Sequence, residues 1–135
     1  MIYTENIRFL FLDDQESRHV LLSRWFSKAD HCYSYDDCVA KLKDKHYDVV
    51  SLDHDLSIAD QMCEPGVTNR EKTGTDIARF IAQMPVKPRV AILHTFNPAG
   101  ARLMNEILSR AQVTVYSVPS DSIRLSTKTW RRDKC

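Results

Sequence analysis

Three apolar segments of the chain each end in side chains that can bind a metal or move a proton. The segment 7–14 reads IRFLFLDD, the segment 47–56 reads YDVVSLDHDL, and the segment 89–97 reads RVAILHTFN. The reactive groups are Asp13 and Asp14 after the first run, Asp53, His54 and Asp55 after the second, and His94 after the third. Carboxylates and imidazoles bind divalent cations and act as general acids or bases. Such chemistry requires a fold that brings the three segment ends together.

The apolar runs are too short for helices and are typical of buried strands. They alternate with segments of helical spacing. The predicted order is strand 7–14, helix 15–30, a weak strand 31–35, helix 36–46, strand 47–53, helix 73–84, strand 89–93, a helix that begins at Asn97 and Pro98, and strand 113–118. Right-handed crossovers convert this alternation into a doubly wound α/β domain. We therefore expect a flavodoxin-like, five-stranded parallel sheet between two helical layers, with the first and third strands adjacent.

Helical spacing also predicts which side chains face the core. In the first helix, Leu21, Leu22, Trp25, Phe26 and Ala29 fall on one side. The third helix should bury Ile77, Phe80, Ile81 and Met84, and the fourth Met104, Ile107, Leu108 and Ala111. Thr73 and Asn97 are expected to cap the helices that follow them. Residues 57–72 contain Pro65 and Gly66 without a sustained period and predict a long exposed loop.

Length and composition predict one domain over residues 1–135, with a core over about 7–118 and a short polar tail at 119–135. Nineteen basic and 18 acidic residues give a formal charge of +1, which offers no broad attraction for duplex nucleic acid or an anionic membrane. No run is long enough to span a membrane and no signal peptide is evident, so we expect a cytoplasmic protein. The four cysteines lack metal-finger spacing; Cys32 and Cys38 are expected to be reduced core residues.

The acids predict a divalent metal. In the expected sheet Asp13, Asp14, Asp53 and Asp55 converge at one edge, where like charges repel unless a cation lies among them. Oxygen ligands favour Mg²⁺ or Mn²⁺, and coordination by a histidine would favour Mn²⁺ or another transition metal. Each residue also has a structural alternative, since aspartates cap turns and helices, and a single histidine such as His94 often only completes hydrogen bonds. His19, His31 and His46 are expected to be structural in this sense.

The acids after the first and third strands resemble those of receiver domains of two-component signalling. Asp13, Asp14 and Asp53 match the receiver acids, and Thr95 matches the hydroxyl residue after the fourth strand. The resemblance implies that Asp53 occupies the phospho-acceptor position. The receiver lysine is missing, because Val118 precedes Pro119 where that lysine would stand. This departure argues against an ordinary phosphorelay.

A closer resemblance is to the family called the cyclic-phosphate processing receiver domain. The matching motifs are FLDD at 11–14, SLDHDL at 51–56, TG at 73–74 and HTFNPAG at 94–100, within a similarity that extends from Ile7 to Val118. Members often carry an arginine and a proline soon after the two aspartates, whereas this chain reads QESR at 15–18. The resemblance implies processing of a cyclic or diester phosphate.

The expected activity is a metal-dependent phosphodiesterase acting on a small cyclic nucleotide or another cyclic phosphate. Asp13, Asp14 and Asp53 would hold a Mg²⁺ or Mn²⁺ ion that polarises a phosphoryl oxygen and activates water. His54 and His94 would share the proton transfers, with the acid and base left unassigned, and Asp55 would join the metal or orient a histidine. The residues expected to bind substrate are Thr95, Asn97, Gly100 and Lys72, with helix amino ends favouring phosphate.

Two other functions stay open. The same pocket could capture a cyclic nucleotide without cleaving it, as a sensor or sponge, or the chain could be an atypical receiver that acts through a partner protein. The expected partner is a small-molecule cyclic phosphate, without strong duplex nucleic-acid binding, and a homo-oligomer is left open.

Overall fold

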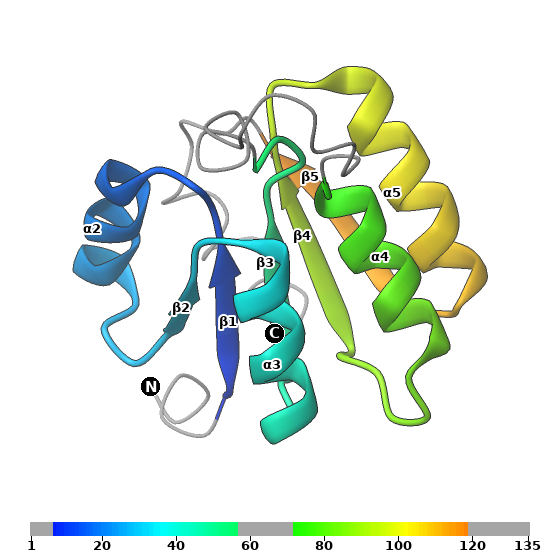
Figure 1. The fold of residues 1–135 in the computed structure, drawn as a ribbon, viewed down its shortest axis with the longest axis horizontal. Helices are drawn as coiled ribbons and strands as arrows, with labels where there is room; N and C mark the ends of the chain where they lie inside the picture. The colour runs from blue at the N-terminus through cyan, green and yellow to red at the C-terminus, as the bar shows by residue number, and fades with distance from the viewer. Residues whose placement is uncertain (1–6, 57–71, 119–135) are drawn as a thin grey trace, which may run out of the picture.

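A parallel five-stranded sheet forms the centre of the computed structural model, which describes residues 7–56 and 72–118 (Figure 1). Its strands lie in the order β2-β1-β3-β4-β5. Their bounds are β1 Phe9–Leu12, β2 Asp30–Cys32, β3 Val49–Leu52, β4 Val90–His94 and β5 Thr114–Val118. The flavodoxin-like order predicted from the sequence is confirmed, including the adjacency of the first and third strands.

Four helices connect the strands within these described ranges: α2 Glu16–Trp25, α3 Tyr35–Asp44, α4 Gly74–Gln83 and α5 Pro98–Arg110. Both predicted caps are present. The Thr73 hydroxyl accepts a hydrogen bond from Thr75 N while Asp76 accepts one from Thr73 N, which is a capping box. The Asn97 side chain accepts from Gly100 N, and Pro98 follows in the first turn. These caps fix where α4 and α5 begin, at the edge where the strands end.

Alternating side chains divide the core into two layers, one on each face of the sheet. Leu10, Leu12, Val50 and Leu52 pack with buried residues of α3, α4 and α5. On the opposite face Phe9, Phe11, Val49 and Ile92 pack with Leu22 and Phe26 from α2 and its end. Cys32 and Cys38 are buried and reduced, as expected. The three central strands β1, β3 and β4 are therefore buried on both sides.

The predicted buried face of the first helix is partly wrong. Leu21 and Trp25 are 38% and 43% exposed, whereas His19, Leu22 and the capping Phe26 are buried. The helix also ends at Trp25, so Ala29 lies beyond it. A buried face assigned from apolar residues alone leaves out His19, which is polar. His19 is nevertheless buried, because both its ring nitrogens are hydrogen-bonded.

Several predictions lie outside the described residues: most of the loop 57–72, the tail 119–135, and Cys63 and Cys135. No helix in the described ranges is long and apolar enough to cross a membrane.

The first turn of α4 approaches the end of β3 closely. Gly74 N donates to His54 O over 2.8 Å, and a Cβ added at Gly74 would lie 2.1 Å from Asp53 O and 2.9 Å from the Met104 sulfur. Only glycine permits this approach, which ties the helix to the loop that carries Asp53.

We predict that Gly74→Ala lowers the free energy of unfolding by about 1–3 kcal/mol, because the backbone carbonyl of Asp53 must move to admit the methyl group. Urea unfolding measures the change. The control is Gln83→Ala at the exposed end of the same helix, expected to change stability by less than about 0.5 kcal/mol. Equal stability of the two variants would contradict the close approach.

Candidate functional site

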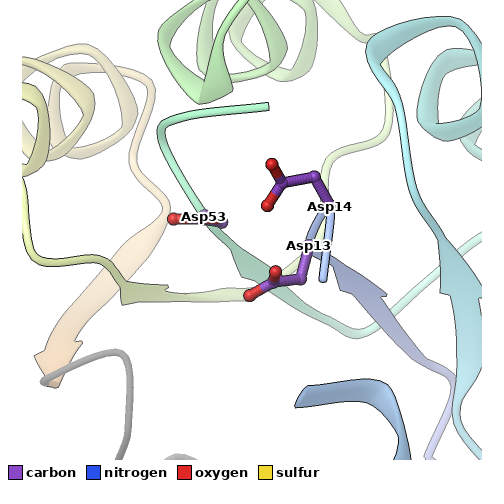
Figure 2. Close-up of side chains that lie close together, drawn as sticks. All are labelled: Asp13, Asp14 and Asp53. Carbon is purple, nitrogen blue, oxygen red and sulfur yellow. The ribbon is translucent and has the colours of Figure 1, made fainter. Parts of the chain in front are cut away.

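Three carboxylates gather at the carboxyl ends of the adjacent strands β1 and β3 (Figure 2). Asp13, Asp14 and Asp53 each offer one oxygen, and these oxygens lie within 4.8 Å of one another. Asp13 and Asp53 are buried, whereas Asp14 is partly exposed. The sequence predicted this set, and the parallel register that pairs Leu12 with Leu52 brings it together. The donor set is all oxygen, which fits Mg²⁺ or Mn²⁺.

Behind Asp13, a hydrogen-bonded chain runs across three strands. Ser51 and His94 lie on the α2 face because side chains of a strand alternate in direction. The Ser51 hydroxyl lies 2.7 Å from His94 Nδ1, and His94 Nε2 lies 3.1 Å from Asp13 Oδ2. The imidazole of His94 also stacks on Phe11, with ring centroids 4.6 Å apart. This chain fixes the orientation of Asp13.

The protonation of His94 follows from its environment. Its side chain is completely buried, and this burial lowers the pKa of His94 despite the neighbouring carboxylate of Asp13. We therefore assign a neutral ring whose Nε2–H donates to Asp13 and whose Nδ1 accepts from the Ser51 hydroxyl. Burial by itself would raise the pKa of Asp13, but the hydrogen bond from His94, the Gln15 amide and Arg18 hold that pKa below its usual value.

The site contains a cation that the sequence did not predict. Nη1 of Arg18 lies 3.3 Å from Asp13 Oδ1, 3.1 Å from Asp13 Oδ2 and 3.5 Å from Asp53 Oδ2. Arg18 is in the first turn of α2, which begins directly behind β1. The segment QESR departs from the expected motif. The signal that could have identified Arg18 is its position on the helical turn nearest the two acids.

Among the three acids, Asp53 has the most strongly raised pKa. Burial, and next the charge of Asp13, raise the pKa of Asp53 to about 7. Its Oδ1 accepts a hydrogen bond of 2.8 Å from His54 N, and Arg18 approaches Oδ2. Burial and the charge of Asp13 also raise the pKa of Asp14. The cluster therefore holds more negative charge than its neighbours neutralise.

His54 forms a second group beside the acids. Its Nδ1 lies 2.9 Å from Asp55 Oδ1, and Asn97 Nδ2 lies 3.3 Å from the same nitrogen. The shorter contact to a carboxylate favours a proton on Nδ1, which leaves Nε2 able to accept one. A Cβ added at Gly100 would lie 2.5 Å from the His54 ring, so the ring packs directly on the first turn of α5. The motifs SLDHDL and HTFNPAG thus meet at His54.

The other expected substrate residues have defined places. Thr95 Oγ1 accepts a hydrogen bond from Asn97 N over 3.1 Å and shapes the turn before α5. Lys72 Nζ lies 5.2 Å from the centroid of the Tyr35 ring, a cation–π contact at the start of α3.

His19, expected to be structural, bonds to the backbone oxygen of Asp13 through Nε2 and to His31 through Nδ1.

We predict that Asp53→Asn stabilises the metal-free protein at alkaline pH. The folded state retains a proton on Asp53 that the unfolded chain releases above about pH 4, so stability falls as pH rises from about 4 towards 7. Because asparagine carries no charge, its stability gain over the wild type should be larger at pH 8 than at pH 5, by on the order of 2 kcal/mol. Urea unfolding in EDTA measures both values. Asp44→Asn, at an exposed position of α3, is the control; a gain for Asp53→Asn that is equal at both pH values would refute the assignment.

The structural comparisons show the same fold in receiver domains. A CheY-like receiver domain protein from Methanospirillum hungatei JF-1 aligns with a TM-score of 0.65 at 10% identity, covering 94% of this chain and 92% of that one. The response regulator TrrA from Thermotoga maritima, in complex with Mg²⁺-BeF, aligns with a TM-score of 0.63 at 19% identity, covering 93% and 97%. A response regulator from Burkholderia pseudomallei, with a phosphorylated aspartic acid, calcium ion and citrate, has a TM-score of 0.60 at 12% identity, covering 95% and 73%.

The sequence itself points to a narrower group. No curated protein matches the chain. The family model described as cyclic-phosphate processing receiver domain matches residues 8–110, a range that holds every element from β1 to α5 and all the site residues described above. The chain therefore belongs to the cyclic-phosphate processing receiver domain family.

Proposed function

We propose that this domain is a metal-dependent phosphodiesterase that opens a cyclic or diester phosphate of a small molecule such as a cyclic nucleotide. One observation supports this proposal above all: an oxygen-ligand cluster of Asp13, Asp14 and Asp53 lies beside a histidine–carboxylate pair, His54 and Asp55. Diester hydrolysis needs a cation for the phosphate and a group that moves a proton. The acids that could hold the cation and the pair that could move the proton lie at the same edge of the sheet.

The three acids would hold the metal. When bound, a divalent ion would stabilise charge on a phosphoryl oxygen and favour ionisation of water. Asp13 is oriented for this task by His94, which is in turn fixed by Ser51. We therefore propose that His94 acts by positioning Asp13, because its buried ring has both nitrogens engaged. Hydrogen-bond partners behind a ligand commonly govern the affinity of a metal site in this way.

His54 would move the proton. With Nδ1–H directed at Asp55, its Nε2 can accept a proton from water and later return it to the leaving oxygen. Asp55 is 65% exposed on its side chain and would act by fixing the tautomer of His54. The close packing of His54 on Gly100 holds the ring against α5. Thr95 and the amino end of α5 would receive phosphate oxygens, and Lys72 would attract the anion to the site.

A second candidate is an atypical receiver with Asp53 as phospho-acceptor. The Burkholderia pseudomallei relative of known structure carries a phosphorylated aspartic acid. In this chain Asp53 directly follows β3, at the position that the likeness to receivers assigns to the phospho-acceptor. Against this function, Val118 at the end of β5 packs against the apolar layer on the α2 face and brings no cation to the edge. Mass spectrometry after incubation with acetyl phosphate and Mg²⁺ separates the functions, since only a receiver gains an acid-labile phosphate on Asp53.

The proposal predicts hydrolysis in a screen of 2′,3′-cyclic nucleotides, 3′,5′-cyclic nucleotides and cyclic dinucleotides with Mn²⁺ or Mg²⁺. Chromatography of the products should show linear phosphates, and EDTA should abolish them. Asp53→Asn should lose metal-dependent turnover, whereas Asp44→Asn should keep the wild-type rate. Recovery of every compound intact, with one of them bound, would favour a sensor or sponge over an enzyme.

For the proton-transfer pair, we predict that His54→Gln lowers kcat by about 10²–10⁴-fold with a smaller change in KM, because glutamine cannot exchange the proton. Asp55→Asn should lower kcat less, since the ring remains packed on Gly100. The control is His46→Gln, at an exposed position just beyond the end of α3. Steady-state rates on the substrate found in the screen provide the measurement, and a His54→Gln variant with wild-type kcat would exclude this role.

A further inference from the structure

Arg18 contacts two of the three acids that could hold a cation. Its side chain is 21% exposed, whereas those of Asp13 and Asp53 are 0% and 6% exposed. The guanidinium therefore lies between two buried carboxylates and the solvent. Each of its contacts with the acids is made by Nη1, which reaches both oxygens of Asp13 and one of Asp53.

The hydrogen bonds of Asp13 leave little room for another cation. A carboxylate offers about four lone-pair positions. At Asp13, Oδ1 accepts from Gln15 N and from Arg18, and Oδ2 accepts from His94 Nε2 and from Arg18. The Gln15 donor is a backbone amide, and the His94 donor is a buried side chain. A metal that binds Asp13 must therefore take a position that Arg18 holds.

The location of Arg18 makes it the most easily displaced of these partners. It lies in the first turn of α2, where the helix dipole favours acids and disfavours a positive side chain. Within the described residues, the ion pairs with Asp13 and Asp53 compensate for this placement. A divalent ion would neutralise the acids and repel the guanidinium. The loss of its attraction to the acids and the field of the helix would then both favour outward movement of Arg18.

We propose that Arg18 is a displaceable counter-ion: it neutralises the acids before metal binds, and after displacement it binds the phosphate of the substrate. The second step rests on the proposed function; the first requires only the metal site. A guanidinium suits the second step because it carries five N–H donors in a planar fork that matches phosphate oxygens in pairs. One side chain would thus link metal binding to anion binding.

Calorimetric titration tests the first step with MnCl₂ alone. We expect Arg18→Gln to bind Mn²⁺ about 3–10-fold more tightly than the wild type, because no cation has to be displaced. Arg24→Gln, at an exposed position in the last turn of the same helix, removes an equal charge and should bind within twofold of the wild type. Equal Mn²⁺ affinity of Arg18→Gln and the wild type would overturn displacement.

Inorganic phosphate tests the second step on the Mn²⁺-saturated protein. Arg18→Gln should bind phosphate about tenfold more weakly, and Arg18→Lys should bind it more weakly while retaining an Mn²⁺ affinity near that of the wild type, because lysine keeps the charge but lacks the fork. Wild-type phosphate affinity in both variants would overturn the role in substrate binding. Neither titration depends on turnover, so a protein that binds Mn²⁺ but hydrolyses nothing would refute the proposed function alone.

If Arg18→Gln fails to fold, the wild type supplies the test. In protein labelled with ¹⁵N-arginine, addition of diamagnetic Mg²⁺ should shift the Arg18 Nε–H resonance and accelerate its exchange with water. An Arg18 resonance that is unchanged at saturating Mg²⁺ would overturn the proposal.

Discussion

Repulsion among three carboxylates at the edge of a buried sheet is the constraint that shapes this site. Oxygens of Asp13, Asp14 and Asp53 lie within 4.8 Å of one another, where the dielectric is low and like charges are costly. Each acid meets the cost differently. Asp13 remains ionised because His94, Gln15 and Arg18 donate to it, whereas Asp53 has a pKa raised to about 7. A divalent cation would neutralise the remaining charge. The acids are therefore the centre of the site, and the neighbouring groups orient them and donate hydrogen bonds to them.

The arrangement around the acids follows from a few local rules. Alternation along β3 and β4 places Ser51 and His94 on the face that carries Asp13, and parallel register sets their separation. Two glycines allow close approach on the other side of the site: Gly74 admits the Asp53 carbonyl and Gly100 admits the ring of His54. The TG and HTFNPAG motifs therefore position the loop that carries SLDHDL. These glycines leave room for Asp53 and His54, in addition to their place in the backbone of their own helices.

Most of the fold could be predicted from the sequence because its signals are local: short apolar runs, spaced helices, and Thr73 and Asn97 as caps. The three acids could be predicted for the same reason, since strand ends meet at one edge of a parallel sheet. Arg18 and Ser51 could not, because their roles depend on which way a helix turns and on contacts between strands. The buried face of α2 was predicted only in part for a related reason: His19 is polar, and its burial depends on bonds to Asp13 and His31.

The central claim is that these three acids form one divalent-metal site. Diffraction from crystals soaked in MnCl₂, collected on both sides of the manganese absorption edge, locates the ion directly by its anomalous signal. We predict one strong peak within about 2.0–2.3 Å of oxygens from Asp13 and Asp53, with Asp14 bound directly or through water. The Arg18 guanidinium should have moved away from Asp13. A peak elsewhere on the protein, or an acid cluster without manganese and with Arg18 still in place, would contradict the claim.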